Sequence, residues 1–272
     1  MTRRIAYLGP PGTFSQAAAL RGAGADCELL DCRGIDEVFA AVESGRADHG
    51  VAPIENSTEG AVNHTQDCLI DSPALIIGER IVPIEHHLLA REGFSRTEIN
   101  LIASHPQSLA QCREWLRANQ PQTALRECVS NAEAARLAAE GGGVAAIAGA
   151  IAGETYGLRA LAQSIQDQAG NRTRFAVLGR EPAPPSGRDK TSILVYAENR
   201  PGALFRVLEP FERLGISLTR LESRPSRDQK WEYIFFMDFQ GHRQDAKVAE
   251  LFHRLGDRTD AVKILGSYAV DN

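Results

Sequence analysis

The sequence predicts two domains, an α/β domain over residues 1–180 and an α+β, ferredoxin-like domain over residues 191–272. From Ile5 to Gly179, short apolar runs alternate with helical patterns, which is typical of α/β proteins. Residues 181–190 gather proline, glycine and charge, and this composition predicts a linker. Beyond it the order of the patterns is βαββαβ. Such a unit forms an antiparallel sheet with two helices on one face.

In the first domain, the apolar runs predict strands and the 3.6-residue patterns predict helices. The strands are expected at 5–9, 27–32, 49–54, 74–84, 86–90, 99–104, 123–129, 144–150 and 175–179, and the helices at 14–20, 35–45, 62–69, 107–119 and 131–142. The glycines at 141–143 are expected to end the last of these helices rather than to bind phosphate.

In the second domain, the same patterns predict four strands and two helices. The strands are expected at 191–197, 216–226, 231–241 and 261–269, and the helices at 201–215 and 245–256. Pro201 lies near the start of the first helix, a position that proline tolerates well.

Composition excludes several classes of function. The 272 residues are 43% hydrophobic with a net charge of -5, and they contain no basic block, so no nucleic-acid partner is expected. No stretch is long and apolar enough to predict a membrane span, and the N-terminus does not resemble a secretory signal. The five cysteines lack a CxxC pair and are expected to be reduced thiols. A cytoplasmic enzyme or sensor with a small ligand fits these features best.

Four loops follow predicted strands and are rich in hydroxyls, amides or glycines, which bind anions without titrating. The first, residues 9–16 (GPPGTFSQ), lacks the Gly-Lys-Ser/Thr end of a phosphate loop and the G-x-G-x-x-G pattern, so a nucleotide is not expected. Thr13 or Ser15 could cap the following helix, bind a ligand, or do both, because a helix N-terminus attracts anions.

The second loop, residues 53–63 (PIENSTEGAVN), places Asn56 and Ser57 in a turn before a helix. A turn with an N-cap needs only one or two such residues, so the sequence leaves a structural and a functional role about equally open.

The third loop, residues 104–112 (SHPQSLAQC), also opens a helix. Ser104 lies at its start, and Gln107 and Gln111 share a helical face because they are four residues apart. His105 invites a general-base role, but a loop histidine without a nearby nucleophile is more often structural. The adjacent His86 and His87 do not have the spacing of metal ligands, and no metal site is expected.

The fourth loop, residues 171–175 (NRTRF), places a hydroxyl between two guanidinium groups at the start of a strand. Because side chains alternate along a strand, Arg172 and Arg174 should point to one face and Thr173 to the other. We therefore expect an irregular backbone here, with Thr173 turned into a cleft and Arg174 reaching an acidic or anionic partner.

Taken in order, these four motifs, the linker, and the segments ENRPGALFRVL and LTRLESRPS resemble prephenate dehydratases with a C-terminal ACT regulatory domain. The resemblance covers nearly the whole chain. It implies a two-lobed α/β catalytic domain similar to the type 2 periplasmic-binding-protein fold, with the active cleft between the lobes. It also implies a carbon–oxygen lyase of phenylalanine biosynthesis, in which prephenate loses CO₂ and water to give phenylpyruvate. That reaction gains aromaticity and requires no cofactor.

The resemblance also implies roles for individual residues. The catalytic hydroxyl is Thr173. The substrate-binding residues are Thr13, Ser15, Asn56, Ser57, Ser104, Gln107, Gln111, Arg174 and Phe175. L-Phenylalanine is expected to bind at two segments of the ACT domain, Gly202, Ala203 and Leu204, and Glu222, Ser223, Arg224 and Pro225, where two ACT domains meet. Feedback inhibition and a homodimer or homotetramer follow from that arrangement.

Two alternative functions remain open. A non-catalytic amino-acid sensor could share both domains, although a sensor has no need of a hydrogen-bond donor such as Thr173 at a leaving group. Arogenate dehydratase acts on a substrate with an amino-acid side chain in place of the keto acid, and the sequence names no residue that decides between the two substrates.

Overall fold

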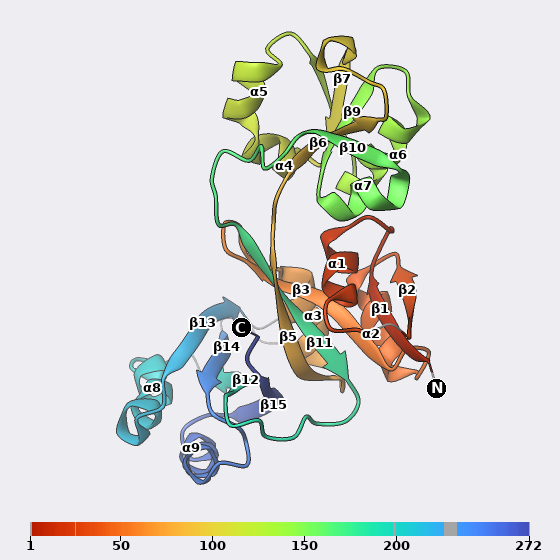
Figure 1. Cartoon of the computed structure of the whole chain (residues 1–272). Coiled ribbons are helices and arrows are strands. Elements are labelled where there is room, and N and C mark those ends of the chain that lie inside the picture. Colours follow the sequence, from red (N-terminus) through yellow and green to blue (C-terminus); the bar gives the residue numbers. More distant parts are fainter. Residues whose placement is uncertain (1, 25, 198–199, 226–232, 272) are drawn as a thin grey trace. The chain divides into compact units, whose positions relative to one another are not determined.

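The computed structural model describes residues 2–24, 26–197, 200–225 and 233–271 (Figure 1). The expected strand at 231–241 lies in part outside these residues. The chain divides into two compact units. The first comprises Met1–Gln66 and Arg80–Phe175, and the second comprises Asp67–Glu79 and Ala176–Asn272. The boundary between the units therefore passes through helix α3 and strands β5 and β11, whose bounds follow.

The first sheet has the strand order β2-β1-β3-β11-β5, with β4 paired to β3. Its strands are β1 (Arg3–Leu8), β2 (Cys27–Cys32), β3 (His49–Asn56), β4 (Gly60–Ala61), β5 (Leu75–Pro83) and β11 (Arg172–Gly179). The helices of this part are α1 (Phe14–Leu20), α2 (Ile35–Glu43) and α3 (Asn63–Asp71). Strand β1 pairs in parallel with both β2 and β3, as the alternation of strands and helices predicts.

The second sheet has the order β10-β6-β9-β7-β8 and forms the second lobe of the first unit. Its strands are β6 (His87–Arg91), β7 (Leu101–Ser104), β8 (Ala124–Glu127), β9 (Val144–Ala148) and β10 (Leu158–Ala162). Its helices are η1 (Arg96–Glu98), α4 (Pro106–Gln111), α5 (Arg113–Asn119), α6 (Asn131–Glu140) and α7 (Ala150–Tyr156). Strand β7 runs parallel to β8 and β9, whereas β6 runs antiparallel to β9 and β10.

The second lobe departs from the sequence prediction at two places. The single helix expected at 107–119 is broken at Cys112 into α4 and α5. The carboxylate of Asp167 accepts hydrogen bonds from the N–H groups of Glu114 and Trp115, at 2.9 and 3.0 Å, and so caps a new helix start. Helix α7 and strand β10 were not predicted. Gly141 ends α6 at φ 94°, which confirms the expected helix stop.

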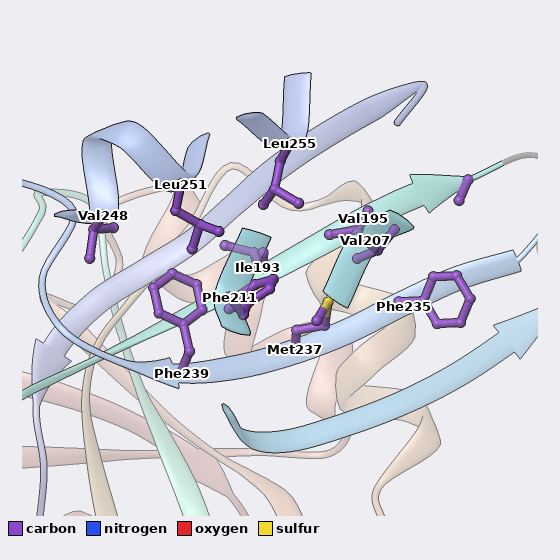
Figure 2. Packing of buried hydrophobic residues seen from close by; sticks show 11 residues of the cluster. Ile193, Val195, Val207, Phe211, Phe235, Met237, Phe239, Val248, Leu251 and Leu255 are labelled. Atoms are coloured by element: carbon purple, nitrogen blue, oxygen red, sulfur yellow. The ribbon is translucent and has the colours of Figure 1, made fainter. Parts of the chain in front are cut away.

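The C-terminal part of the second unit has the predicted ferredoxin-like topology. Strands β12 (Asp189–Ala197), β13 (Leu218–Pro225), β14 (Tyr233–Gln240) and β15 (Ala261–Ala269) form an antiparallel sheet in the order β13-β14-β12-β15. Helices α8 (Ala203–Leu214) and α9 (Ala246–Gly256) pack on one face of it. Figure 2 shows the core between them, in which Phe211 of α8 and Leu251 of α9 meet Ile193, Met237 and Phe239 of the sheet.

The other face of this sheet contacts residues 67–79, which belong to the same unit. The ammonium group of Lys263 donates to three carbonyl oxygens at the C-terminal end of α3, at 2.8 to 3.0 Å. Such a cation satisfies carbonyls that a helix end leaves without partners. Lys190 forms a buried ion pair with Glu79 at 2.8 Å, and Arg224 pairs with Asp67 at 2.8 Å.

All five cysteines are free thiols. Burial raises the pKa of the Cys112 thiol to about 12, with a smaller contribution from Asp167, so this thiol is not a reactive nucleophile. Within the described residues, no helix is long and apolar enough to cross a membrane.

Candidate active site

A cleft of about 680 Å³ lies in the first unit and draws its lining from both lobes. This volume is typical of small-molecule sites. The lobe of the first sheet contributes Leu8, Gly9, Pro10, Thr13, Phe14, Ser15, Arg33, Pro53, Asn56, Thr173 and Phe175. The second lobe contributes His105, Gln107, Ser108, Gln111, Val129, Ser130, Asn131, Glu133 and Arg136, and the segments that join the lobes contribute Ile84, His86 and Asn171.

Strand β11 carries Thr173 and Phe175 into the cleft by ordinary alternation. Both side chains are buried and line the cleft, whereas Arg172 is exposed on the other face. Arg174 forms an ion pair with Glu55 at 3.0 Å, which is the acidic partner that the sequence predicts. The expected irregular backbone is absent, because β11 is a continuous strand from Arg172 onward. The side chains of Thr173 and Arg174 point to opposite faces of the sheet, Thr173 into the cleft and Arg174 toward Glu55.

The hydroxyl of Thr173 is oriented by Asn56 at the end of β3. The amide nitrogen of Asn56 donates to Thr173 Oγ1 at 2.9 Å and to Asn171 Oδ1 at 2.9 Å. Asn56 Oδ1 accepts from the N–H groups of Thr58 and Glu59, which fixes the orientation of this amide. Because Thr173 Oγ1 accepts a bond from Asn56, the proton of its own hydroxyl is available to a ligand in the cleft.

Two further amides continue this network. Asn171 Oδ1 also accepts from Ser57 Oγ at 3.2 Å, and Asn171 Nδ2 donates to Gln111 Oε1 at 3.3 Å. Gln111 Oε1 lies 2.9 Å from His86 Nε2. Hydrogen bonds of this kind hold neutral side chains in fixed orientations, so the cleft presents a preorganised set of polar groups.

In the second lobe, Asn131 organises the loop after β7. Its Oδ1 accepts from Ser104 Oγ, from the N–H of His105 and from Ser108 Oγ, at 3.0 to 3.2 Å. Ser104 is fully buried and donates also to the carbonyl of Ile147 at 2.6 Å. The ring of His105 accepts from the N–H of Gln107 and caps α4, which is the structural role that the sequence favours for it.

The lining of the cleft includes two cationic side chains. Arg33 and Arg136 line it together with one acidic residue, Glu133, and Arg136 also forms an ion pair with Glu140. Ser130 caps α6 by accepting from the N–H of Glu133, so this helix directs its positive N-terminal end toward the cleft. These features favour an anionic ligand. Among the described residues, no three His, Cys, Asp or Glu side chains come together as metal ligands.

The structure brings most of the predicted substrate-binding residues together. Thr13, Ser15, Asn56, Gln107, Gln111, Thr173 and Phe175 line the cleft. Three predicted residues, all in the described part of the chain, lie outside its lining: Ser57, Ser104 and Arg174. Ser104 is buried beneath the lining and donates a hydrogen bond to Asn131, which lines the cleft. Ser57 is bonded to the backbone of Arg172 at the start of β11.

Sequence reasoning missed other lining residues. Asn131 lies in a segment that matches none of the four motifs. Asn171 begins the fourth motif, but the motif does not indicate a role for it, and the spacing of His86 and His87 argues only against a metal site. The sequence carries no clear signal for Arg33, in the loop after β2, or for Arg136, in α6, because neither segment matches any of the four motifs.

A second pocket, of about 360 Å³, lies in the ACT-like part of the second unit. The described residues that line it are Ala197, Arg200, Gly202, Ala203, Leu204, Phe205, Ser223, Tyr233 and Phe235. Thus the two predicted segments meet here, at Gly202 to Leu204 and at Ser223. Leu204, Phe205 and Tyr233 keep 37, 69 and 39% of their surface exposed.

The remaining predicted residues of this pocket lie elsewhere. Strand β13 pairs Ser223 with Phe235 on the helix-covered face, so the neighbouring Glu222 and Arg224 point to the opposite face. There Glu222 forms an ion pair with Arg220, and Arg224 pairs with Asp67. Pro225 ends the strand and is exposed.

The fold and the two pockets define a two-lobed α/β domain with a cleft of the size of a small-molecule site, followed by a ferredoxin-like domain with a pocket of its own. Comparison with known proteins gives the family. The family model "Prephenate dehydratase" matches residues 5–183, and the model "ACT domain" matches residues 191–257. The chain therefore belongs to the prephenate dehydratase family and carries an ACT domain. This confirms the family, the fold class and the dehydratase function that the sequence predicts.

Individual proteins that resemble the chain include two named prephenate dehydratases and one described as an acylase. The chain is 49% identical to the bifunctional chorismate mutase/prephenate dehydratase of Stutzerimonas stutzeri over 265 residues, which are 97% of this chain and 73% of that protein. A prephenate dehydratase from Arthrobacter aurescens, solved in complex with L-Phe, is 37% identical with a TM-score of 0.89, over 98% of this chain and 90% of that one. GqqA, described as a novel type of quorum-quenching acylase, is 32% identical with a TM-score of 0.90, over 99% and 98% of the two chains.

Proposed function

We propose that the cleft of the first unit converts prephenate to phenylpyruvate, with Thr173 as the donor to the departing hydroxyl group, which makes the enzyme a carbon–oxygen lyase. One observation carries this assignment. The Thr173 hydroxyl accepts from Asn56 and is left with a proton to donate, inside a cleft that Arg33 and the N-terminal end of α6 also line.

The reaction requires the protein to orient the substrate and to donate hydrogen bonds to it. The bond between the ring and its carboxylate breaks, and the electron pair flows into the ring as the C4 oxygen leaves. The products are phenylpyruvate, CO₂ and water, and one proton is taken up per turnover. Because aromatisation drives the step, a hydrogen bond from Thr173 that strengthens as negative charge develops on the leaving oxygen lowers the barrier.

The two carboxylates of prephenate would be held by the positively charged parts of the cleft. Arg33, Arg136 and the N-terminal end of α6 lie in its lining, and arginine can bind a carboxylate through two parallel hydrogen bonds. The family model and two of the similar proteins are named for prephenate, and this supports prephenate rather than arogenate as the substrate. Phe175 adds an apolar wall beside Thr173.

Activity with both substrates tests this proposal. The purified protein is incubated with prephenate and, separately, with arogenate, and phenylpyruvate and phenylalanine are measured. We expect phenylpyruvate from prephenate with a kcat/KM that exceeds the value for arogenate. An equal or higher kcat/KM for arogenate would contradict the substrate assignment, and no reaction with either would support the sensor instead.

For regulation, we propose that L-phenylalanine binds the second pocket and inhibits the dehydratase. Small residues at Gly202 and Ala203 allow a close approach of the ligand to the backbone, and Leu204, Tyr233 and Phe235 offer apolar walls for its ring. The exposed apolar side chains at the rim support a second ACT domain as the cover, and hence a homodimer or homotetramer. The predicted roles of Glu222, Arg224 and Pro225 would then be indirect.

Allosteric coupling makes this part of the proposal measurable. An inhibitor must bind one state of the enzyme better than the other, so substrate and L-phenylalanine should each weaken the binding of the other. Identical activity with and without saturating L-phenylalanine would contradict it. A cytoplasmic location is part of the same proposal and follows from the biosynthetic role of the reaction.

A further inference from the structure

His86 lies where the chain crosses from one lobe of the first unit to the other. It follows β5 and immediately precedes β6, and it is 1% exposed. Its backbone N–H donates to Gln166 Oε1 at 3.0 Å, and its carbonyl accepts from the N–H of Ile165 at 2.8 Å. The return crossing of the chain therefore holds the backbone of His86 in place.

The imidazole contacts both lobes. Its ring meets the ring of Phe14 edge to face, with centroids 5.8 Å apart, and Phe14 belongs to α1 of the first lobe. Its Nε2 lies 2.9 Å from Oε1 of Gln111, the last residue of α4 in the second lobe. Both of these contact residues line the cleft, as His86 does.

The hydrogen-bond pattern fixes which atoms donate. Asn56 Oδ1 accepts from two backbone N–H groups, so its Nδ2 is the atom that donates to Asn171, which must present Oδ1 to it. Asn171 Nδ2 then donates to Gln111, which must present Oε1, and His86 Nε2 must carry the proton that completes the pair with this oxygen. Gln111 is then left with its NH₂ group for the cleft. Asn171 Oδ1 is likewise left for Asn56, which holds Thr173.

Burial keeps the imidazole neutral. It lowers the pKa of His86 below its ordinary value; the hydrogen bond with Gln111 acts in the opposite direction, and the neighbouring His87 lowers the pKa further. The ring nitrogen Nδ1 has no hydrogen-bond partner among the described residues. A neutral imidazole with its proton on Nε2 fits these surroundings better than the protonated ring, which would bury a second, charged N–H group without an acceptor.

We propose that His86 is a positioning residue of the dehydratase cleft, which holds the Gln111 amide so that its NH₂ group faces the substrate and which, through Asn171 and Asn56, steadies the Thr173 hydroxyl. The expected effects on kcat rest on the proposed dehydratase function. The geometric part concerns only the orientation of Gln111 and stands independently of turnover.

Three substitutions at this position test the proposal. His86→Leu removes the donor and keeps an apolar side chain in the buried site. His86→Gln restores an N–H donor that reaches about as far as Nε2, whereas His86→Asn is polar but too short to reach Gln111. His87→Leu is the matched control, because His87 is also buried and accepts a bond from the N–H of Ser164, yet it does not line the cleft.

We expect kcat to fall about 5- to 10-fold in His86→Leu and His86→Asn, the size of one neutral hydrogen bond, with most of the activity restored in His86→Gln. The control His87→Leu should lose stability but keep its kcat. If His86 acts through Gln111, then His86→Leu should cost nothing further in a Gln111→Ala background.

Two results would overturn the proposal. One is an equal loss of kcat in His86→Leu and His87→Leu, which would indicate a general structural effect. The other is an unchanged kcat penalty for His86→Leu in the Gln111→Ala background. The side-chain NH₂ signals of Gln111 in ¹⁵N NMR spectra provide a readout that needs no turnover, and they should shift in His86→Leu and not in His87→Leu. If the wild type fails to convert prephenate, the proposed function fails, while these signals still decide the positioning role.

Discussion

Thr173→Val replaces the proposed donor with a side chain of nearly the same shape. In the wild type, Thr173 Oγ1 accepts one bond from Asn56, at 2.9 Å. After the substitution Asn56 Nδ2 still has Asn171 Oδ1 at 2.9 Å, and the carbonyl of Arg172 lies at 3.4 Å. The amide therefore keeps its orientation, and the free energy of unfolding should fall by only about 1 kcal/mol.

The effect on the rate should be much larger than the effect on stability. Loss of one donor to a developing oxyanion typically lowers kcat by about 10²- to 10³-fold. KM should change little, because the hydrogen bond from Thr173 strengthens mainly in the transition state. Thr173→Ser should keep appreciable activity, since it keeps the hydroxyl. Steady-state assays of phenylpyruvate formation and thermal unfolding measure the two effects separately.

Thr65→Val provides the matched control. Thr65 is also buried in the first unit, and its hydroxyl donates to the carbonyl of Pro53, but it does not line the cleft. This variant should lose stability and keep its kcat. The assignment of Thr173 would be refuted by a kcat for Thr173→Val within about fivefold of the wild-type value, the size of an ordinary neutral hydrogen bond.

Three further predictions concern stability. Lys190→Met removes the ammonium group that pairs with the buried carboxylate of Glu79, and the free energy of unfolding of the second unit should fall by about 1.5–3 kcal/mol in urea titrations because hydrogen bonds between charged groups are lost; an unchanged free energy of unfolding would contradict the buried ion pair. Gly266→Ala would place a Cβ against the backbone oxygen of Ile76 in β5, so the two strands must move apart and the melting temperature should drop by several degrees; an unchanged melting temperature would contradict this close approach. Burial lowers the pKa values of His86 and His87, so below about pH 6.5 these side chains bind more protons in the unfolded chain than in the folded chain, and the free energy of unfolding should decrease as the pH falls. Replacing His87 with Gln should make the free energy of unfolding depend less on pH, and an unaltered pH dependence would contradict this prediction.

Much of the fold could be predicted because local patterns and tertiary packing agree. The βαββαβ order of the C-terminal part follows from apolar periodicity alone, and its helices and sheet enclose the expected core. The break between α4 and α5 could not be predicted in this way. It depends on Asp167, which caps α5 from a segment more than 50 residues further along the chain.

The loops of the site could be predicted from their motifs, but the directions of the individual side chains could not. The motifs name the loops that carry Thr173, Asn56 and Gln111, and the ends of neighbouring strands bring these loops together. The sequence does not show which face each side chain takes. An irregular strand was expected so that Thr173 and Arg174 could act together, whereas regular alternation sends Thr173 to the cleft and Arg174 to Glu55.

Residues whose roles depend on distant partners were the hardest to predict. His86 and Asn171 join the site only because both crossings between the lobes pass beside Gln111. The motif ESRP resembles a single binding segment, yet in the strand its alternate residues face opposite sides of the sheet. Ser223 lines the second pocket, and Arg224 reaches Asp67.

The central claim is that this cleft performs the decarboxylating dehydration of prephenate. A single-turnover experiment, with the purified protein in excess over prephenate, tests it most directly, because it observes the chemical step without product release. We predict one phenylpyruvate and one CO₂ for each prephenate consumed, at a rate that falls about 10²- to 10³-fold in Thr173→Val. Prephenate that remains unchanged with the wild-type protein, or equal rates for the two proteins, would contradict the account.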